Sequence, residues 1–443
     1  MNYLFSGKEL RKLIIPLVVE QFLTIMIGTI DSIMVSDVGE AAVSAVSLVD
    51  SIMILLANLF VALATGGGII AGQAIGRKRK QEGCESTEQT VLFSVLVGIF
   101  VTGIMLLGKN WIFGTVFGNI TEDVFRNCNI YYSIVAFSVP FLALYNAGAS
   151  MYRAMGESKT PMITSFFMNV IHVIITFTLV KVFQIGIAGA GISSLFSRIF
   201  SGLVMLWLIS NKEKILHIRT LKIKPNVNIL KKIMYIGVPF AIESSLFQVG
   251  KIWVLSLIAS LGTAAIAANA VSGTIAGFAV MAGSSLGVAM SIVTAQCVGA
   301  GDMEQVKYYV KKLMKYAYGF LMVVNVLIFL AIPLILNAYQ LSDETARIVR
   351  QLIIYHSIGV VTIWPLAFMF PNVLRAANDV TYCMIVSIAS MWIFRIGFSY
   401  LFVLTFQVGV IGVWIAMTLD WVVRGTLFTL RYKSGKWKTK LSA

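Results

Sequence analysis

Residues 13–36 read LIIPLVVEQFLTIMIGTIDSIMVS, an apolar stretch interrupted by Pro16, Glu20, Gln21 and Asp31. One helix of this length crosses the roughly 30 Å of hydrocarbon in a bilayer. A carboxylate at that depth costs about 2.5 to 3.5 kcal/mol on insertion scales, so Glu20 and Asp31 mark a functional face. At about 100° per residue, their spacing puts both on nearly the same side of the helix. We expect that side to face protein or water; the alternative is two buried acids bound by neighbouring helices.

The composition extends this pattern to the whole chain. Of 443 residues, 58% are apolar and 12% charged, and the mean hydropathy is +0.86. A soluble domain of this length could not hide so much apolar surface in one core. The sequence therefore predicts an all-α polytopic membrane protein with twelve transmembrane helices, at 13–36, 43–71, 89–108, 130–152, 161–183, 187–210, 233–260, 264–297, 313–336, 350–374, 381–406 and 410–431.

The distribution of lysine and arginine predicts the orientation. These residues gather in the N-terminal segment, in the connections after even-numbered spans and in the C-terminal tail; the opposite connections hold only Lys109, Arg126, Lys181, Arg347 and Arg350. The positive-inside rule places both termini in the cytoplasm. It also accounts for the net charge of +15 without nucleic acid, because basic clusters beside a membrane attract anionic lipid headgroups.

An internal repeat divides the chain. A shift of 223 residues superimposes Pro16 on Pro239, Glu20 on Glu243 and further polar and glycine positions downstream. The repeat covers six helices, an even number, so both copies enter the membrane from the same side. We predict two six-helix lobes, 1–210 and 233–443, related by a pseudo-twofold axis around a central cleft and joined by a basic cytoplasmic linker, 211–232.

Several stretches resemble the multidrug and toxic compound extrusion (MATE) family of bacterial exporters. They are PLVVEQFLTIMIGTIDSIMVSDVGEAAVSAVSLVDSI, GGGIIAGQAIGRKRKQE, ASMYRAMGESKTPM, IGVPFAIESSLFQVGKIWVLSLIASLGTAAIAANAV and PNVLRAANDV. The most specific part is the first-helix proline with an aspartate fifteen residues later, followed by a Val-x-x-x-Gly-x-x-Ala turn. The resemblance covers nearly the whole chain in order.

The resemblance implies an antiporter that exchanges Na⁺ or H⁺ for amphipathic, often cationic organic compounds by alternating access. It implies a multi-pass protein of the bacterial cytoplasmic membrane that works as a monomer, with small-molecule substrates and the bilayer as partners. No cofactor beyond the coupling ion and no resident metal is expected. A Walker GxxxxGK[ST] motif is missing from the sequence, in keeping with transport that uses no ATP.

In the family, the first-helix aspartate belongs to the cation or proton site of the N-terminal lobe, and Asp31 matches it. One branch completes that site with an asparagine and an aspartate on helix five and a hydroxyl on helix six. Asn169 matches the asparagine and Ser194 the hydroxyl, but Val173 stands where the second aspartate is expected. His172 beside it could handle the proton instead, since imidazole titrates near neutrality. The alternative is a buried neutral histidine.

A further family position departs from the pattern. Other branches carry an acid about two turns after the seventh-helix proline, Pro239, where this chain has Phe247. Glu243 lies only one turn after that proline, so we do not transfer the acid's role to it.

The repeat suggests a separate role for the glutamates. Glu20 and Glu243 are symmetry mates on helices one and seven, so we expect both at the cleft, with at least one of them touching substrate or the coupling ion. Lys251, two turns beyond Glu243, is expected at the same cleft and could neutralise Glu243; the alternative is that Glu243 and Lys251 form a structural ion pair. Trp253 and Trp364 could stack an apolar cation, because a desolvated cation on an indole face gains about 2 kcal/mol.

Three other protein classes could share an apolar composition of this kind. A flippase for lipid-linked precursors, or an exporter of one specialised metabolite, is the nearest alternative within the superfamily. An enzyme is not expected, because the three histidines and four cysteines are scattered and no nucleophile motif is visible; we expect the cysteines to be packing residues. A channel would need more polar residues along a pore.

Overall fold

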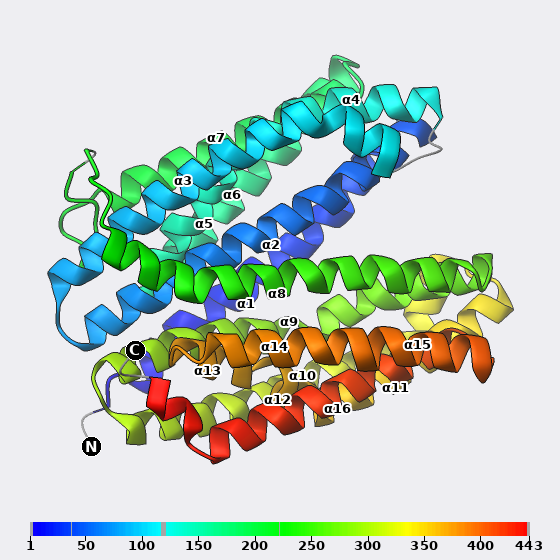
Figure 1. Ribbon diagram of the computed structural model, residues 1–443. Coiled ribbons are helices and arrows are strands. Elements are labelled where there is room, and N and C mark those ends of the chain that lie inside the picture. The colour runs from blue at the N-terminus through cyan, green and yellow to red at the C-terminus, as the bar shows by residue number, and fades with distance from the viewer. Residues whose placement is uncertain (1–2, 37, 117–120, 221, 441–443) are drawn as a thin grey trace. The chain divides into compact units, whose positions relative to one another are not determined.

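The computed structural model describes residues 3–36, 38–116, 121–220 and 222–440, except for the side chains of residues 27–33, 36, 115 and 116. Every regular element in these ranges is a helix (Figure 1). The chain forms two compact units, Gly7–Ala241 and Met1–Ser6 with Ile242–Ala443. The all-α prediction is thus confirmed. Helix α8 begins at Val227, so the last six residues of the predicted linker, 227–232, are helical.

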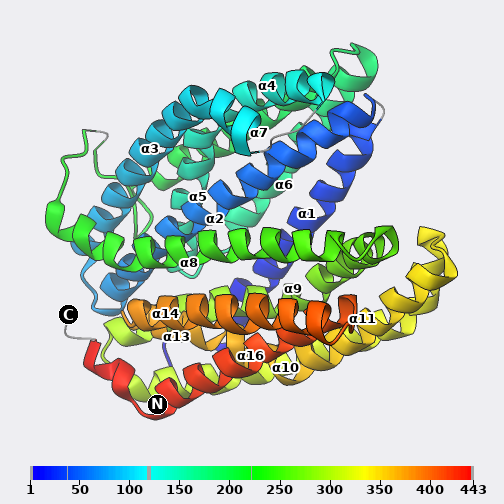
Figure 2. The same cartoon turned by 45° about the vertical axis from the view of Figure 1, so that its right-hand side comes forward.

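The first unit contains the elements whose labels run from α1 to α7, together with the first half of α8. Their bounds are α1 Gly7–Ser36, α2 Glu40–Gly76, α3 Lys80–Trp111, η1 Ile112–Val116, α4 Glu122–Ala136, α5 Val139–Ala154, α6 Lys159–Thr176, η2 Phe177–Val182, α7 Ile187–Ile209 and α8 Val227–Ala259. Helix α8 continues through Pro239 as a single helix (Figure 2).

The second unit contains the rest of α8 and the elements that follow it. Their bounds are α9 Thr263–Gly299, α10 Met303–Tyr339, α11 Asp343–Thr362, α12 Trp364–Phe368, α13 Phe370–Ala376, α14 Val380–Ser390, η3 Met391–Gly397, α15 Phe398–Tyr400, η4 Leu401–Thr405, α16 Val410–Lys433 and η5 Lys436–Lys440. The short N-terminal segment belongs here as well: the Leu4 amide donates to Gln305 Oε1 at 2.8 Å.

Nine of the described helices are long and apolar enough to cross a membrane, and two bent pairs raise this to eleven. Eleven of the twelve predicted spans, all but the first, match one of these helices or pairs, with an overhang of at most one residue. The first, 13–36, lies in α1, whose side chains at 27–33 are outside the described residues. The polytopic membrane fold is therefore confirmed.

The backbone repeats in the two units at the predicted offset. A π-helical turn in each unit, η2 and η4, is followed two residues after its end by a glutamine with a positive φ angle: 53° at Gln184 and 51° at Gln407. Non-glycine residues rarely adopt this conformation. A matching pair at one offset is therefore a structural signature of the repeat.

Two predicted spans bend beside prolines. Helices α4 and α5 meet at 46°, with Pro140 in the first turn of α5, and α11 meets the α12–α13 pair at 64°, with Pro365 in the first turn of α12. Proline has no backbone donor, so the first turn of a helix, where that donor would have no intrahelical partner, accommodates it best. The bends set the direction of the helices that carry Arg153 and Arg375.

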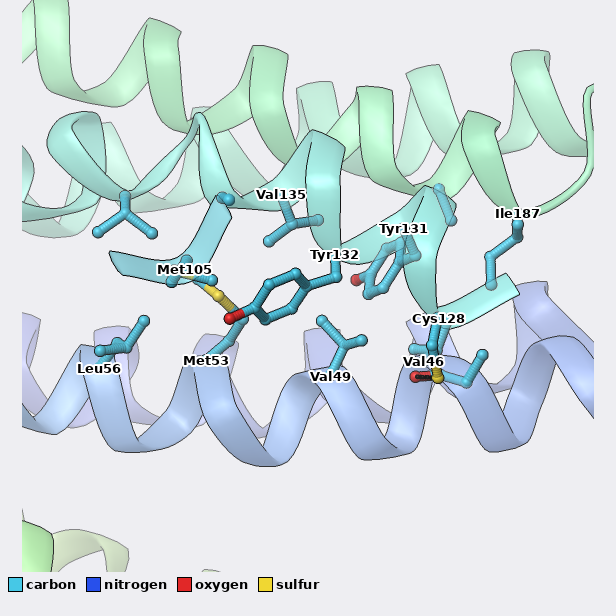
Figure 3. Close-up of a cluster of buried hydrophobic side chains, with 14 of the residues drawn as sticks. Val46, Val49, Met53, Leu56, Met105, Cys128, Tyr131, Tyr132, Val135 and Ile187 are labelled. Atoms are coloured by element: carbon cyan, nitrogen blue, oxygen red, sulfur yellow. Dashed lines mark hydrogen bonds between the residues drawn. The ribbon is translucent and has the colours of Figure 1, made fainter. Parts of the chain in front are cut away.

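The core of the first unit packs α2 against α4. Figure 3 shows Val49 and Met53 of α2 pointing toward Tyr132 of α4, which is completely buried. Cys128 lies in the same cluster. All four cysteines are buried free thiols, as packing residues would be.

Helices α2 and α8 approach each other at a glycine. A Cβ at Gly66 would lie 2.7 Å from the Ile233 carbonyl oxygen and 2.8 Å from the Gly237 nitrogen, both of them backbone atoms that cannot rotate away. The close contact therefore requires glycine. Gly103 in α3 offers a matched contrast, because a Cβ there would meet nothing within 4 Å.

We predict that Gly66→Ala lowers the unfolding free energy by about 1 to 3 kcal/mol through overpacking. Gly103→Ala should be neutral or slightly stabilising, since alanine favours helix by about 1 kcal/mol over glycine. The measurement is the thermal unfolding midpoint of each variant in detergent, after a sizing column has shown that the sample is monodisperse. Equal midpoints for the two variants would contradict the close contact.

Candidate functional sites

Glu20 is held by an ion pair within the first unit. It lies on α1 and is 9% exposed. Arg153, in the last turn of α5, donates from Nη2 to Glu20 Oε1 at 2.6 Å, and the Tyr145 hydroxyl donates to the same oxygen at 3.0 Å. The other oxygen, Oε2, has no hydrogen-bond partner in the described part of the chain. Half of this carboxylate is therefore committed to its neighbours.

Glu243 has the equivalent partner in the second unit. Arg375 on α13 donates from Nη2 to both carboxylate oxygens, at 2.7 and 2.8 Å, and both residues are buried. Asn372 accepts from Arg375 Nη1 at 3.4 Å. Charge-assisted bonds of this kind are the strong ones, and they fix α8 to α13.

The two ion pairs are copies of one another. Glu20 and Glu243 are 223 residues apart, and Arg153 and Arg375 are 222 apart. The sequence prediction included the two glutamates but not their arginine partners. The signal that could have identified the pairs is that glutamates and arginines recur at nearly the same offset. The partner of Glu243 is Arg375 and not Lys251. A role of either glutamate in contacting substrate or coupling ion stays a prediction.

The predicted ion-coupling residues of the first unit partly converge. His172 Nδ1 lies 3.5 Å from the Ser197 hydroxyl, which itself donates to the Ser194 carbonyl at 3.1 Å. Asn169 lies one turn before His172 on α6, which packs against both α1 and α7. Sequence reasoning missed Ser197. The side chain of Asp31, on α1, is outside the described residues.

A cavity of about 440 Å³ lies within the second unit, with charged and aromatic walls. Lys251 of α8 and Arg395 of η3 supply its charged side chains, and no acid is among the described residues that line it. The principal aromatic residues of its walls are Phe247, His356, Trp364, Phe368, Trp414 and Trp421.

The predicted tryptophans have different surroundings. Trp364 lines the cavity and stacks on Phe368, with ring centroids 5.0 Å apart and planes at 18°. Trp253 is 51% exposed and meets Trp392 edge-on at 5.0 Å. It is not among the lining residues, so its predicted role in substrate stacking stays untested.

A basic cavity of about 760 Å³ lies beside the α5–α6 connection of the first unit; Lys8, Arg11, Lys12 and Lys159 are among its lining residues. Glu157 in the same wall pairs with Lys214 at 2.8 Å. Burial acts to raise the pKa of Glu157, but hydrogen bonds from Lys214 and Thr160 outweigh it and hold the pKa below its ordinary value. This acid therefore stays ionised among the lysines.

The buried ion pair of the first unit should behave as one unit. We predict that Glu20→Gln and Arg153→Gln each lower the unfolding free energy by about 3 to 5 kcal/mol, because each leaves a buried charge without its partner. The double variant should cost much less than the sum.

The exposed pair Glu304–Lys307, 2.7 Å apart, is the matched control, and its cycle should yield only about 0 to 1 kcal/mol. Thermal unfolding of the two cycles provides the comparison. If the losses of unfolding free energy in the Glu20 and Arg153 variants simply add in the double variant, the two side chains do not stabilise the fold as a pair.

Comparison with known proteins agrees with the repeat. The sequence profile of the MatE family matches residues 16–178 and 239–401, two segments displaced by 223 residues. "Probable multidrug resistance protein NorM" of Thermotoga maritima is 22% identical over 98% of this chain and 93% of its own length; "Probable multidrug resistance protein YoeA" of Bacillus subtilis is 27% identical over 91% and 88%. A solved outward-facing multidrug resistance MATE family transporter of the MOP superfamily aligns with a TM-score of 0.90 at 18% identity, over 98% of this chain and 97% of that one. Because the family profile matches a segment in each half of the chain, and the two segments together cover more than half of its residues, this chain belongs to the MATE family of membrane transporters.

Proposed function

We propose that this transporter is an antiporter that takes in Na⁺ or H⁺ and exports amphipathic organic compounds, organic cations among them, by alternating access. The observation that carries the proposal is the group of His172, Ser194 and Ser197 in the first unit, on helices that pack together with the helix of Asp31. The similar multidrug resistance proteins support export as the direction.

The chemistry of this group suits either coupling ion. Hydroxyl, carbonyl, amide and carboxylate oxygens are the ligands that hard cations prefer, and Asp31, Asn169 and Ser194 would supply them. A proton could instead be exchanged by Asp31 or by the His172 imidazole, because an imidazole ring can both accept and donate a proton. Either ion would neutralise Asp31 within the membrane, where its charge is costly.

The arrangement in the membrane is part of the proposal. The positive-inside rule places both termini in the cytoplasm, with 1–210 and 233–443 as two lobes and 211–232 as their linker. Each lobe contains its own copy of the buried Glu–Arg pair, so each can move as a body while keeping its charges neutralised. A monomer would contain everything that such a cycle needs.

An exporter of a lipid-linked precursor or of one specialised metabolite is the second candidate. The cavity of the second unit favours it, because Lys251 and Arg395 suit a substrate that has an anionic group. The two candidates differ in whether transport requires a cation gradient and in how many chemical classes are exported.

Asp31→Asn tests the coupling. Purified protein in liposomes, with Na⁺ and H⁺ gradients imposed separately, should export a fluorescent organic cation under one gradient. We predict that Asp31→Asn reduces this ion-driven export at least tenfold, because an amide can neither release a proton nor supply charge to Na⁺.

The matched control is Glu40→Gln, which removes an exposed acid from the first turn of α2 and should transport like the unaltered protein. The Asp31 variant should keep the same elution volume and melting midpoint. Undiminished gradient-driven export by Asp31→Asn would overturn the assignment of this residue.

A further inference from the structure

We propose that the cavity of the second unit is a binding site for an amphipathic organic anion, an aromatic ring system that carries one carboxylate, sulfonate or phosphate group. The inference deepens the proposed function by naming a charge class for one of its substrate sites, and it rests on that function only for the statement that the ligand is exported. The site is composed of Lys251, Arg395 and the surrounding aromatic walls.

Neither Lys251 nor Arg395 forms an ion pair with an acid in the described part of the chain. The Arg395 guanidinium lies 5.4 Å from the centre of the Phe247 ring, and its buried Nε has no hydrogen-bond partner among the described residues. A buried donor without a partner costs free energy, and an anionic ligand would supply the acceptor.

Asp420 is close to the cavity but is already engaged. Its carboxylate lies 3.5 Å from Arg424 Nε and accepts the Ser390 hydroxyl at 2.5 Å. Arg424 and Arg395 both stack on Phe247, and the Asp420 carboxylate interacts with both guanidinium groups. One negative charge therefore stands against the positive charges of Arg395, Arg424 and Lys251. The balance at the cavity is positive, which opposes a cationic ligand and attracts an anionic one.

The repeat shows that the fold does not require these charges. At the 223-residue offset, Arg395 corresponds to His172 and Asp420 to Ser197, the pair that lies 3.5 Å apart in the first unit. Lys251 corresponds to Gly28. The first copy forms the same helices without any of the three charges. The fold itself therefore does not require these three charged residues, whereas binding of a charged ligand would explain them.

The walls define the rest of the ligand. Trp364 and Phe368 form a stacked pair, and the His356 ring lies edge-on to Trp414 and Trp421, at 5.3 and 5.5 Å. Such surfaces favour flat ring systems, by stacking or edge contacts. A volume of about 440 Å³ is within the usual range for one small organic molecule.

Three probes that share one ring system test the charge preference. They are 2-naphthoate, the neutral 2-naphthylmethanol and the cationic 2-naphthylmethylammonium, each titrated into the full-length protein in detergent and followed by competition with a radiolabelled 2-naphthoate. We expect the anion to bind at least tenfold more tightly than the cation, a difference of about 1.4 kcal/mol. Equal affinities, or a preference for the cation, would overturn the proposal.

Variants locate the site. Lys251→Met should weaken 2-naphthoate binding about tenfold and leave the affinity for 2-naphthylmethanol unchanged. Lys251→Arg, which keeps the positive charge, should keep the anion preference. Lys8→Met removes a lysine of the other basic cavity and is the matched control, with no expected effect. Unaltered anion binding in Lys251→Met would contradict the assignment. Lys251 lies at an exposed position, so we expect Lys251→Met to fold. The site can therefore be tested even if the other cavity variant, Arg395→Met, does not fold.

The result is separable from the coupling mechanism. Binding in detergent involves no gradient, so an antiporter whose coupling ion is misassigned would still show the anion preference. Conversely, loss of the preference with intact gradient-driven export of an organic cation would overturn this site alone.

Discussion

A charged side chain inside a bilayer must meet an opposite charge, a ligand or water, and this constraint organises the whole molecule. Each unit meets this requirement first with the same kind of ion pair. A glutamate on α1 or α8 is bound by an arginine in the last turn of a later helix, Glu20 by Arg153 and Glu243 by Arg375. These pairs fix helices of distant sequence to one another. Each pair is neutral as a whole.

The charges at the proposed ligand sites differ between the two units. In the first unit the proposed site combines Asp31, whose side chain is outside the described residues, with neutral polar side chains of α6 and α7, a set that suits a small cation. In the second unit the charges are those of Lys251 and Arg395 beside aromatic walls, which suits an organic anion. A duplicated fold has thus kept its structural ion pairs and diverged where ligands are expected. Opposite charge preferences in two halves would let one transporter handle a coupling cation without competition from its substrate.

Sequence reasoning reached the architecture because hydropathy and the 223-residue offset are properties of the chain itself. It placed the spans, the repeat and the family correctly, and the bends follow from Pro140 and Pro365. It missed the partners, because an ion pair between α1 and α5 depends on how helices pack, and only the near-equal offsets of Glu20 and Arg153 hinted at it. It also took Lys251 as a neutraliser of Glu243; helical spacing along α8 could not show that Arg375 occupies that role or that Arg395 lies at the same cavity as Lys251.

The central claim, that the two units hold ligands of opposite charge, can be tested by locating both in one crystal. Protein soaked with Tl⁺, as an anomalous substitute for a monovalent cation, and with 6-bromo-2-naphthoate should show thallium beside Asn169 and Ser194 and bromine between Trp364 and Lys251. Thallium in the cavity of the second unit, or bromine beside Asn169, would contradict the account.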